Sequence, residues 1–182
     1  MFTVNIKIKD KNPDFYKKIA KHVKQVSRRR VVAGFPKGRL NNPHYEGANG
    51  KPGPSIIDVA IWNNFGVPEM NIPRRDFMTP ASKKWKEKFE ESVKAVQEEI
   101  IQGKFEIDTF LGIMGEDGAE IIREEITKLQ TPPNAPITIE GGWMRNKKSG
   151  KPFKVQGKGS SNPLVDSGDM SKAPTWELRE RE

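Results

Sequence analysis

Alternating hydrophobic and polar positions predict β-strands near both ends of the chain. Residues 2–8 alternate strictly between apolar and polar side chains, which indicates a strand with one buried face. Residues 30–35 form a short, β-branched apolar run, and we expect this strand to pair with the first. Late in the chain, residues 175–178 favour a last strand, and residues 137–139 and Trp143 are compatible with shorter strand segments.

Apolar residues recur at intervals of three or four positions in four other segments, and this spacing predicts helices. The predicted helices cover residues 13–27, 55–65, 79–103 and 108–130. The expected N-capping residues of the last three are Ser55, Thr79 and Asp108. The second helix is apolar nearly all round, so we expect it to be buried, with Gly66 as its left-handed terminator. Gly115 and Gly118 weaken the middle of the last helix, which allows a kink.

Long loops that contain proline and glycine separate these elements. We expect flexible loops at residues 39–54 and 144–162, and the second contains the turn-like segment 146–150. Residues 67–77 hold two prolines and two adjacent arginines, which predicts an extended loop between two helices. Residues 131–136 contain three prolines and cannot be helical, so they mark a change from helices to strands and loops.

Four or more strands and about four helices, with the long helices consecutive, favour an α+β fold over a regular alternation of strand and helix. The expected architecture is a small, mainly antiparallel sheet packed against two long helices and a shorter buried helix, with long loops. Residues 1–182 are expected to form a single domain, because their number suffices for one core of ordinary size.

Composition restricts the class of protein. Hydrophobic residues make up 34% of the chain, a low share, so much of the surface must be exposed or covered by a partner. The absence of cysteine excludes disulfides, thiolate zinc sites and cysteine nucleophiles, and it fits a reducing compartment. No apolar run reaches the length of a membrane span, and the first residues lack a signal-peptide core. We therefore expect a protein that is soluble and cytoplasmic when it is made.

Positive charge is concentrated in two segments, and the net charge of the chain is +8. Residues 1–39 hold 12 Lys and Arg against two acids, a local charge of +10, whereas the rest of the chain carries −2. Residues 145–158 hold six basic residues and no acid, and Arg145, Lys147 and Lys148 are candidates for contacts with DNA or another subunit. A solvated face, or a face that meets an acidic partner, explains the same pattern.

The sequence gives little support for a catalytic function. His22 lies on the apolar side of the first predicted helix, where a packed core residue is expected, and His44 begins a His-x-Glu triplet without the cysteines of a zinc deaminase. Residues 157–161 lack the first glycine of a phosphate-binding loop. Asp166 and Asp169 have the spacing of a helix N-cap and its N3 residue. We therefore expect no catalytic, cofactor or metal site, and no enzyme.

Two adjacent arginines in the extended loop are the strongest candidates for contacts with another molecule. The guanidinium groups of Arg74 and Arg75 could bind a phosphate backbone or a carboxylate of another chain. Local pairing of one of them with Asp76 or Glu69 is an equally good interpretation. Asp76 and Phe77 are included among the contact candidates, although Phe77 is also expected to anchor the loop to the core.

Two blocks of residues occur in an order and at a separation that carry a resemblance. The first block, residues 61–78, contains Asn64-Phe65-Gly66 and Ile72-Pro73-Arg74-Arg75-Asp76-Phe77-Met78. The second block, residues 162–170, contains Pro163-Leu164-Val165-Asp166-Ser167-Gly168. Over about residues 31–178 the chain resembles the tail-completion and head–tail joining proteins of tailed bacteriophages, the group of the lambda-type tail completion protein Z. It departs from that pattern at Asn64, where the family usually has Glu, at Asp76, where it usually has Pro, and at Pro174, within the usual final strand.

The resemblance implies a structural virion protein without cofactors that acts by assembly. Such a protein forms a homo-oligomeric ring, six-fold by expectation, at the neck or tail end, where it completes the tail and helps to join it to the head. The implied partners are other copies of the chain, neighbouring neck, connector or tail tube proteins and, non-specifically, genomic DNA in the lumen. The implied location is the virion, after assembly in the host cytoplasm, with no role for a membrane.

A basic nucleic-acid-binding module is the alternative function. It rests on the +10 segment at the start of the chain, and it predicts tight binding to DNA with a steep dependence on salt.

Overall fold

The α+β class predicted from the sequence is confirmed. The computed structural model describes residues 14, 16–17, 20–21, 24, 28–36, 53–102, 104–147 and 149–180. The predicted strand at 2–8, His22, His44 and Lys148 lie outside these residues, as does most of the predicted loop at 39–54. Each described residue from 14 to 28 is helical, in agreement with the helix predicted at 13–27.

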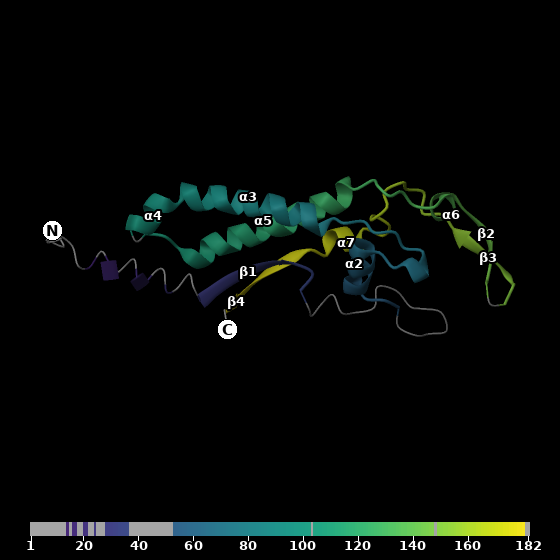
Figure 1. The fold of residues 1–182 in the computed structure, drawn as a ribbon, viewed down its shortest axis with the longest axis horizontal. Helices are drawn as coiled ribbons and strands as arrows, with labels where there is room; N and C mark the ends of the chain where they lie inside the picture. The colour runs from purple at the N-terminus through teal and green to yellow at the C-terminus, as the bar shows by residue number, and fades with distance from the viewer. Residues whose placement is uncertain are drawn as a thin grey trace, which may run out of the picture.

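Two long helices form the body of the molecule. Helix α3 (Met78–Ala95) leads through the short α4 (Gln97–Gln102) into α5 (Ile107–Lys128), which runs back antiparallel to α3 (Figure 1). Ion pairs join the two helices across their exposed edge, one of which links Lys88 Nζ to Asp117 Oδ1 at 2.6 Å. The single helix predicted at 79–103 is therefore divided into α3 and α4 at Val96, whereas the helix predicted at 108–130 agrees closely with α5.

The predicted caps of these two helices are wrong. Helix α3 begins one residue earlier than predicted, and the carboxylate of Asp76 accepts the Thr79 N–H at 3.0 Å. Asp108 lies inside the first turn of α5 instead of capping it. In both helices an acidic group lies near the positive end of the helix dipole, which is a favourable position for a negative charge.

A two-stranded antiparallel ribbon packs along α5. Strand β1 (Arg29–Gly34) pairs with β4 (Thr175–Glu180), its partner among the described residues. The predicted pairing of β1 with residues 2–8 lies outside the described part of the chain. Ala33 lies opposite Trp176 in the register. Because alternate side chains share one face of a strand, Val31 and Leu178 lie on that same face, and they join the core formed with α5.

Glycines in α5 allow close packing and produce no break in the helix. A Cβ on Gly115 would lie 2.6 Å from Trp176 Cδ2, and a Cβ on Gly118 would lie 2.7 Å from Trp85 Cε2. Helix α5 is continuous from Ile107 to Lys128, so Gly115 and Gly118 do not interrupt it. The two glycines are instead the positions at which tryptophan rings approach the helix backbone.

The core is divided between the two ends of the helix pair. The larger cluster comprises the buried residues Ala60, Phe77, Ala81, Ile122, Ile126, Leu164 and Met170. The smaller comprises Phe105, Ile107 and Leu111. The larger cluster draws on segments that are far apart in the sequence, so it fixes the short elements around α2 (Ile56–Phe65) and α7 (Asp169–Lys172) against the helix pair (Figure 1).

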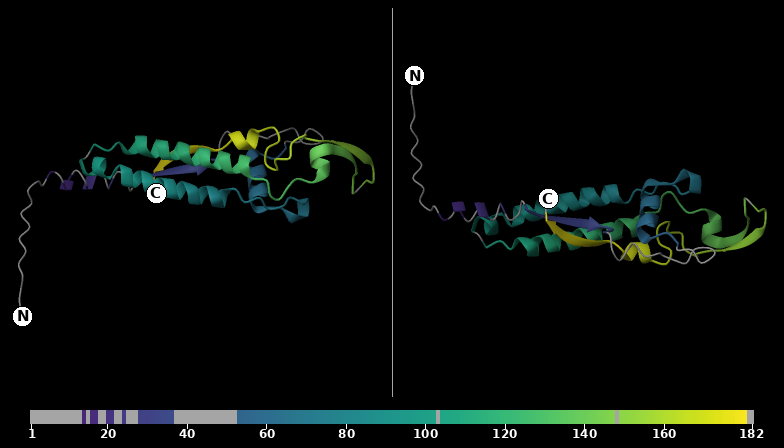
Figure 2. Two further views of the ribbon diagram at one scale, coloured as in Figure 1. Left: turned by 90° about the horizontal axis from the view of Figure 1, so that it is seen from above. Right: turned by 90° about the horizontal axis from the view of Figure 1, so that it is seen from below.

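A hairpin projects from one end of the molecule. Helix α6 (Pro136–Glu140) leads into β2 (Gly141–Arg145), which pairs antiparallel with β3 (Pro152–Gln156) (Figures 1 and 2). The strand predicted at 137–139 is therefore wrong, because these residues belong to α6. The turn at 146–150 is confirmed by the Gly150 N–H, which donates to Asn146 O at 2.8 Å. Residues 152–156, predicted as flexible, form β3.

Candidate docking surfaces at one end of the molecule

The guanidinium group of Arg75 is an internal structural element. Its side chain is buried, with 6% of the residue exposed. The guanidinium donates to four oxygen acceptors, Pro132 O at 3.0 Å, Pro133 O at 3.2 Å, Asn63 Oδ1 at 3.1 Å and Asn134 Oδ1 at 3.1 Å. Burial lowers the pKa of Arg75, but an arginine remains charged at neutral pH. The candidate contact residue Arg75 therefore ties the loop after α2 to the proline-rich segment before α6.

Arg74 and Asp76 form the local ion pair that the sequence allowed. Arg74 Nη2 lies 2.6 Å from Asp76 Oδ2, and 63% of the Arg74 side chain is exposed. The Thr79 N–H lowers the pKa of Asp76, and Arg74 lowers it further. Arg74 is thus accessible but already paired. Phe77, the last contact candidate of this loop, is 1% exposed and belongs to the core.

The residues around Phe65-Gly66 have a geometric explanation. Gly66 has φ 77° and ψ 155°. Its φ is positive as predicted, but the two angles together lie outside the left-handed helical region that was predicted for this helix terminator. A Cβ at this position would lie 2.8 Å from Arg74 N, so glycine lets the returning loop pass directly over the end of α2. Pro73 lies in that returning segment. The buried Asn64 accepts the Met78 N–H at 3.1 Å and fixes the start of α3.

The second block, residues 162–170, closes the fold. Asn162 Oδ1 accepts the N–H groups of Leu164 and Val165 at 3.0 and 3.1 Å, and its amide donates to Thr127 O at 2.7 Å. The predicted N-cap Asp166 is wrong, because Gly168 precedes α7 in the left-handed conformation, with φ 84° and ψ 0°. The hydroxyl of Ser167 donates to Asp169 Oδ2 at 2.6 Å. Asp166, Ser167 and Gly168 therefore serve a tight turn.

An apolar surface on α2 is exposed, contrary to the prediction of a buried helix. The Ser55 hydroxyl and the Asp58 carboxylate form a capping box that starts the helix as predicted. However, Ile61 is 49% exposed and Phe65 is 68% exposed. A pocket of about 340 Å³ lies beside them, and its lining comprises Phe35, Ile57, Ala60, Ile61, Asn64, Phe65, Phe77 and Met78. We call these lining residues the α2 surface.

A larger open groove lies on the other side of Phe65. It has a volume of about 850 Å³ and runs between the loop after α2 and the proline-rich segment before α6. Arg74, Arg75 and Pro73 contribute to one wall, and Asn134 and Thr138 contribute to the other. The groove thus extends from the α2 surface toward the base of the hairpin.

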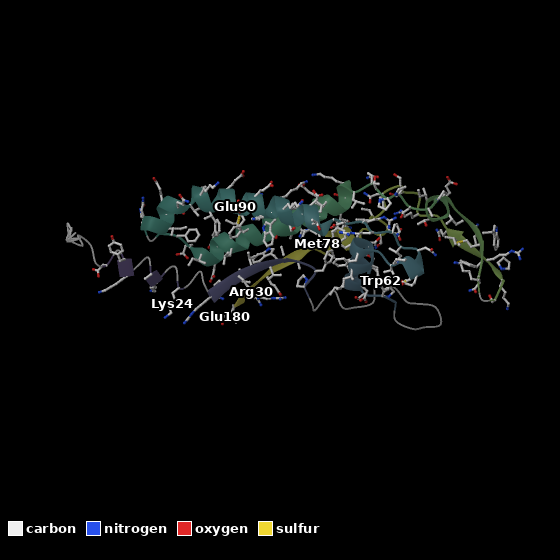
Figure 3. All side chains as sticks on the ribbon, viewed as in Figure 1. Lys24, Arg30, Trp62, Met78, Glu90 and Glu180 are labelled. Carbon is white, nitrogen blue, oxygen red and sulfur yellow. The ribbon has the colours of Figure 1, made fainter. Side chains whose placement is uncertain are left out.

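The hairpin presents two chemically different faces. Met144 lies opposite Phe153 in the register, and Trp143 lies opposite Lys154. Successive side chains of a strand point to opposite faces, so Met144 and Phe153 share one face, while Trp143, Arg145 and Lys154 share the other. Exposure is 42% for Met144, 45% for Phe153 and 72% for Trp143. Figure 3 shows side chains extending outward from the hairpin at this end of the molecule.

The two exposed regions differ in charge. Residues 141–156, which include the candidate contact residues Arg145 and Lys147, hold five Lys and Arg and no acid. Residues 55–72, which include α2, hold Asp58 and Glu69 and no basic residue. Asp58, Glu69, Arg145 and Lys147 are all exposed. The basic hairpin was visible in the sequence, whereas the exposure of α2 was not, because an all-round apolar helix has no pattern that marks its open face.

Comparisons with models of protein families, with curated proteins and with solved structures find no match to this chain. Within the described residues, no group of three or more His, Cys, Asp or Glu is placed to hold a metal ion. The described helices also include none that is long and apolar enough to cross a bilayer.

Proposed function

We propose that this chain is a structural virion protein of a tailed phage, which assembles into a homo-oligomeric ring at the neck or tail end. In that position it completes the tail and helps to join it to the head. The observation that carries the proposal is the location of exposed apolar side chains. Of the eight large hydrophobic residues exposed in the described part of the chain, six lie on α2, the loop after it or the hairpin: Ile61, Phe65, Met70, Trp143, Met144 and Phe153.

Two separate exposed surfaces on one chain favour a ring over a two-fold dimer. When one surface of a copy meets a different surface of the next copy without the reverse contact between the same two copies, the interface is heterologous, and it gives a closed ring when the rotation between neighbours closes. Exposed apolar patches rimmed by polar residues are typical of protein–protein contact sites. The order of the two sequence blocks, which resembles that of tail-completion proteins, supports placing this ring in a virion.

The size distribution of the purified protein tests the assembly, and particle composition tests the location. Analytical ultracentrifugation from micromolar to millimolar concentration is expected to show a discrete oligomer in equilibrium with the monomer. Mass spectrometry of purified phage particles is expected to find the chain in the mature virion. Absence from the particle together with a monomer at every concentration would contradict the proposal.

Nucleic-acid binding is the second candidate function, and one face of the hairpin favours it. Trp143, Arg145 and Lys154 combine an exposed aromatic ring with two cations, an arrangement suited to base stacking and phosphate contacts. Filter binding to single- and double-stranded DNA at low salt tests this function. Retention that disappears between 50 and 200 mM salt is expected for a protein that neutralises several phosphates.

A further inference from the structure

We infer that neighbouring copies contact each other through insertion of the Met144–Phe153 face of one hairpin against the α2 surface of the next copy. This inference rests on the proposed ring and names the contact that builds it. It assigns a donor surface and an acceptor surface to opposite sides of every interface, so each copy gives one hairpin and receives another.

The donor face of the hairpin, which carries Met144 and Phe153, is covered by its own chain only at the root of the hairpin. At the root of the hairpin, a Cβ on Gly142 would lie 2.8 Å from Ile137 Cδ1, so α6 covers this face there. Val155 lies opposite Gly142, and Met144 and Phe153 follow on the same face. Both of these outer side chains are more than two-fifths exposed. The apolar strip therefore extends beyond the part that its own chain covers.

The acceptor surface has a matching shape and chemistry. It is a concave apolar pocket of about 340 Å³, at the lower end of the range for pockets that hold small ligands. Ile61 and Phe65 form part of its lining and are themselves exposed. A single large apolar side chain such as Phe153 can enter a pocket of this kind, and aromatic anchors of this type dominate the energetics of protein interfaces.

Charge complementarity identifies a second copy of this chain as the occupant. The hairpin segment 141–156 has a net charge of +5, and the acceptor segment 55–72 has a net charge of −2. The nearby cation Arg74 is already paired with Asp76 and does not oppose a basic hairpin. Opposite potentials on two patches of the same molecule favour contact between unlike patches and disfavour contact between two hairpins.

The position of the hairpin favours a contact between molecules. In its own chain the hairpin packs against α6 and projects away from α2 (Figures 1 and 2). The donor and acceptor surfaces are therefore available at the same time on one copy, as a continuous ring requires.

Complementary interface variants test the inference. The donor variant, Met144→Asp with Phe153→Asp, retains an intact α2 surface, and the acceptor variant, Phe65→Asp, retains an intact hairpin. Each variant alone is expected to be a monomer, because every interface in its assembly contains one damaged surface. An equimolar mixture is expected to form a 1:1 dimer and nothing larger, because one intact donor meets one intact acceptor. Native mass spectrometry, with one variant labelled with ¹⁵N, measures the composition of each species.

Matched controls separate this contact from a general effect of lost hydrophobicity. Ile113 on α5 is 56% exposed and lies on neither surface, so Ile113→Asp is expected to assemble like the wild type. Trp143→Ala changes the opposite face of the same hairpin and is also expected to leave assembly unchanged. Urea unfolding of every variant checks that the fold is retained. In the wild type, a photo-crosslinking residue at position 153 is expected to label residues 57–65 of a second, isotopically marked copy.

The outcomes distinguish failure of the inference from failure of the proposed function. A wild-type protein that stays monomeric at all concentrations overturns the inference, and its absence from the virion as well contradicts the proposed function. A wild type that assembles together with donor and acceptor variants that assemble equally well overturns the inference alone. The inference is also overturned if the donor variant keeps its assembly but loses affinity for DNA, because the apolar face would then serve nucleic acid.

Discussion

Arg74 and Arg75 are adjacent in sequence but have opposite environments, and this contrast gives a prediction about stability. Replacement of Arg75 by Met leaves its partly buried acceptors on residues 132–134 and Asn63 without this donor. The free energy of unfolding is expected to fall by about 3 kcal/mol, since unsatisfied buried polar groups each cost about 1–3 kcal/mol. Urea denaturation followed by circular dichroism measures the change.

Arg74→Met is the matched control for this substitution. Its ion pair with Asp76 is largely exposed, and exposed pairs contribute about 0–1 kcal/mol. The free energy of unfolding is therefore expected to stay within about 1 kcal/mol of the wild type. Equal destabilisation by the two substitutions would contradict the structural role assigned to Arg75.

The glycines of α5 give a prediction in which helix propensity and packing have opposite signs. Alanine favours a helix over glycine by about 1 kcal/mol, so propensity alone predicts that Gly115→Ala and Gly118→Ala stabilise the protein. The added methyl groups would meet tryptophan rings at 2.6 and 2.7 Å, and overpacking of this kind costs about 1–3 kcal/mol. We expect a net lower melting temperature for both variants, measured by calorimetry.

Gly112→Ala provides the comparison on the same helix. Its added methyl group would lie 3.3 Å from Trp176 Cη2, a contact that a small shift of the ring can relieve. The melting temperature of this variant is expected to equal or exceed that of the wild type. If all three alanine variants are stabilised, the tryptophan rings do not pack against α5 as described.

Asp76 gives a prediction about pH at the start of α3. The Thr79 N–H and Arg74 hold the pKa of this carboxyl below its usual value of 3.8. A lowered pKa in the folded state stabilises the protein fully above pH 3.8, and this contribution is lost as the pH falls through the folded-state pKa. Asp76→Ala is expected to cost about 1 kcal/mol at pH 7, as for other helix-capping residues. The difference from the wild type is expected to shrink below pH 3.8, whereas a constant difference down to pH 2 would contradict this account.

At the scale of elements, local sequence signals predicted the regular structure well and the tertiary environment poorly. The capping box at Ser55 and the last strand were predictable because a few neighbouring residues determine them. Residues 137–139 were predicted as strand from their β-branched composition, yet Pro136 at the start of a helical turn and the glycines after Glu140 favour a short helix. The partner of β1 could not be predicted, because it lies more than 140 positions away in the chain.

The candidate site follows the same division between local and long-range information. The basic character of residues 145–158 was evident from the sequence, but the pairing that separates Trp143 from Met144 onto two faces requires the register. Arg75 was predicted as a contact residue because an arginine in an extended loop is usually exposed. Its burial depends on acceptors nearly 60 positions later, which no local pattern reveals.

The hairpin is expected to be dispensable for folding but required for assembly. A Cβ on Gly141 would lie 2.5 Å from Gly157 N, so the two ends of the hairpin are close enough to join directly. Deletion of residues 142–156 with Gly141 joined to Gly157 removes no residue of either core cluster. The deletion variant is expected to unfold cooperatively with a midpoint close to that of the wild type, and to sediment as a monomer. Loss of cooperative unfolding would show that the hairpin supports the core.

At the scale of the whole molecule, the two core clusters lie toward opposite ends of the elongated helix pair. The exposed apolar residues are concentrated near the end with the larger cluster (Figure 1). Burial of that region between copies would bring the basic hairpin of one copy against the acidic segment 55–72 of a neighbour. Only a few exposed charges therefore favour assembly. Binding to DNA would instead draw on the positive charge of the whole chain, which is +8.

This difference predicts two distinct responses to salt. Exposed ion pairs contribute about 0.2–1 kcal/mol each, so raising salt from 50 to 200 mM is expected to weaken assembly by less than about tenfold. DNA binding that neutralises six to ten phosphates would weaken by about 10³–10⁵ over the same interval. Sedimentation and filter binding on one preparation compare the two slopes directly. An assembly that weakens as steeply as DNA binding would show that charge, and not the apolar contact between Phe153 and the α2 surface, holds the copies together.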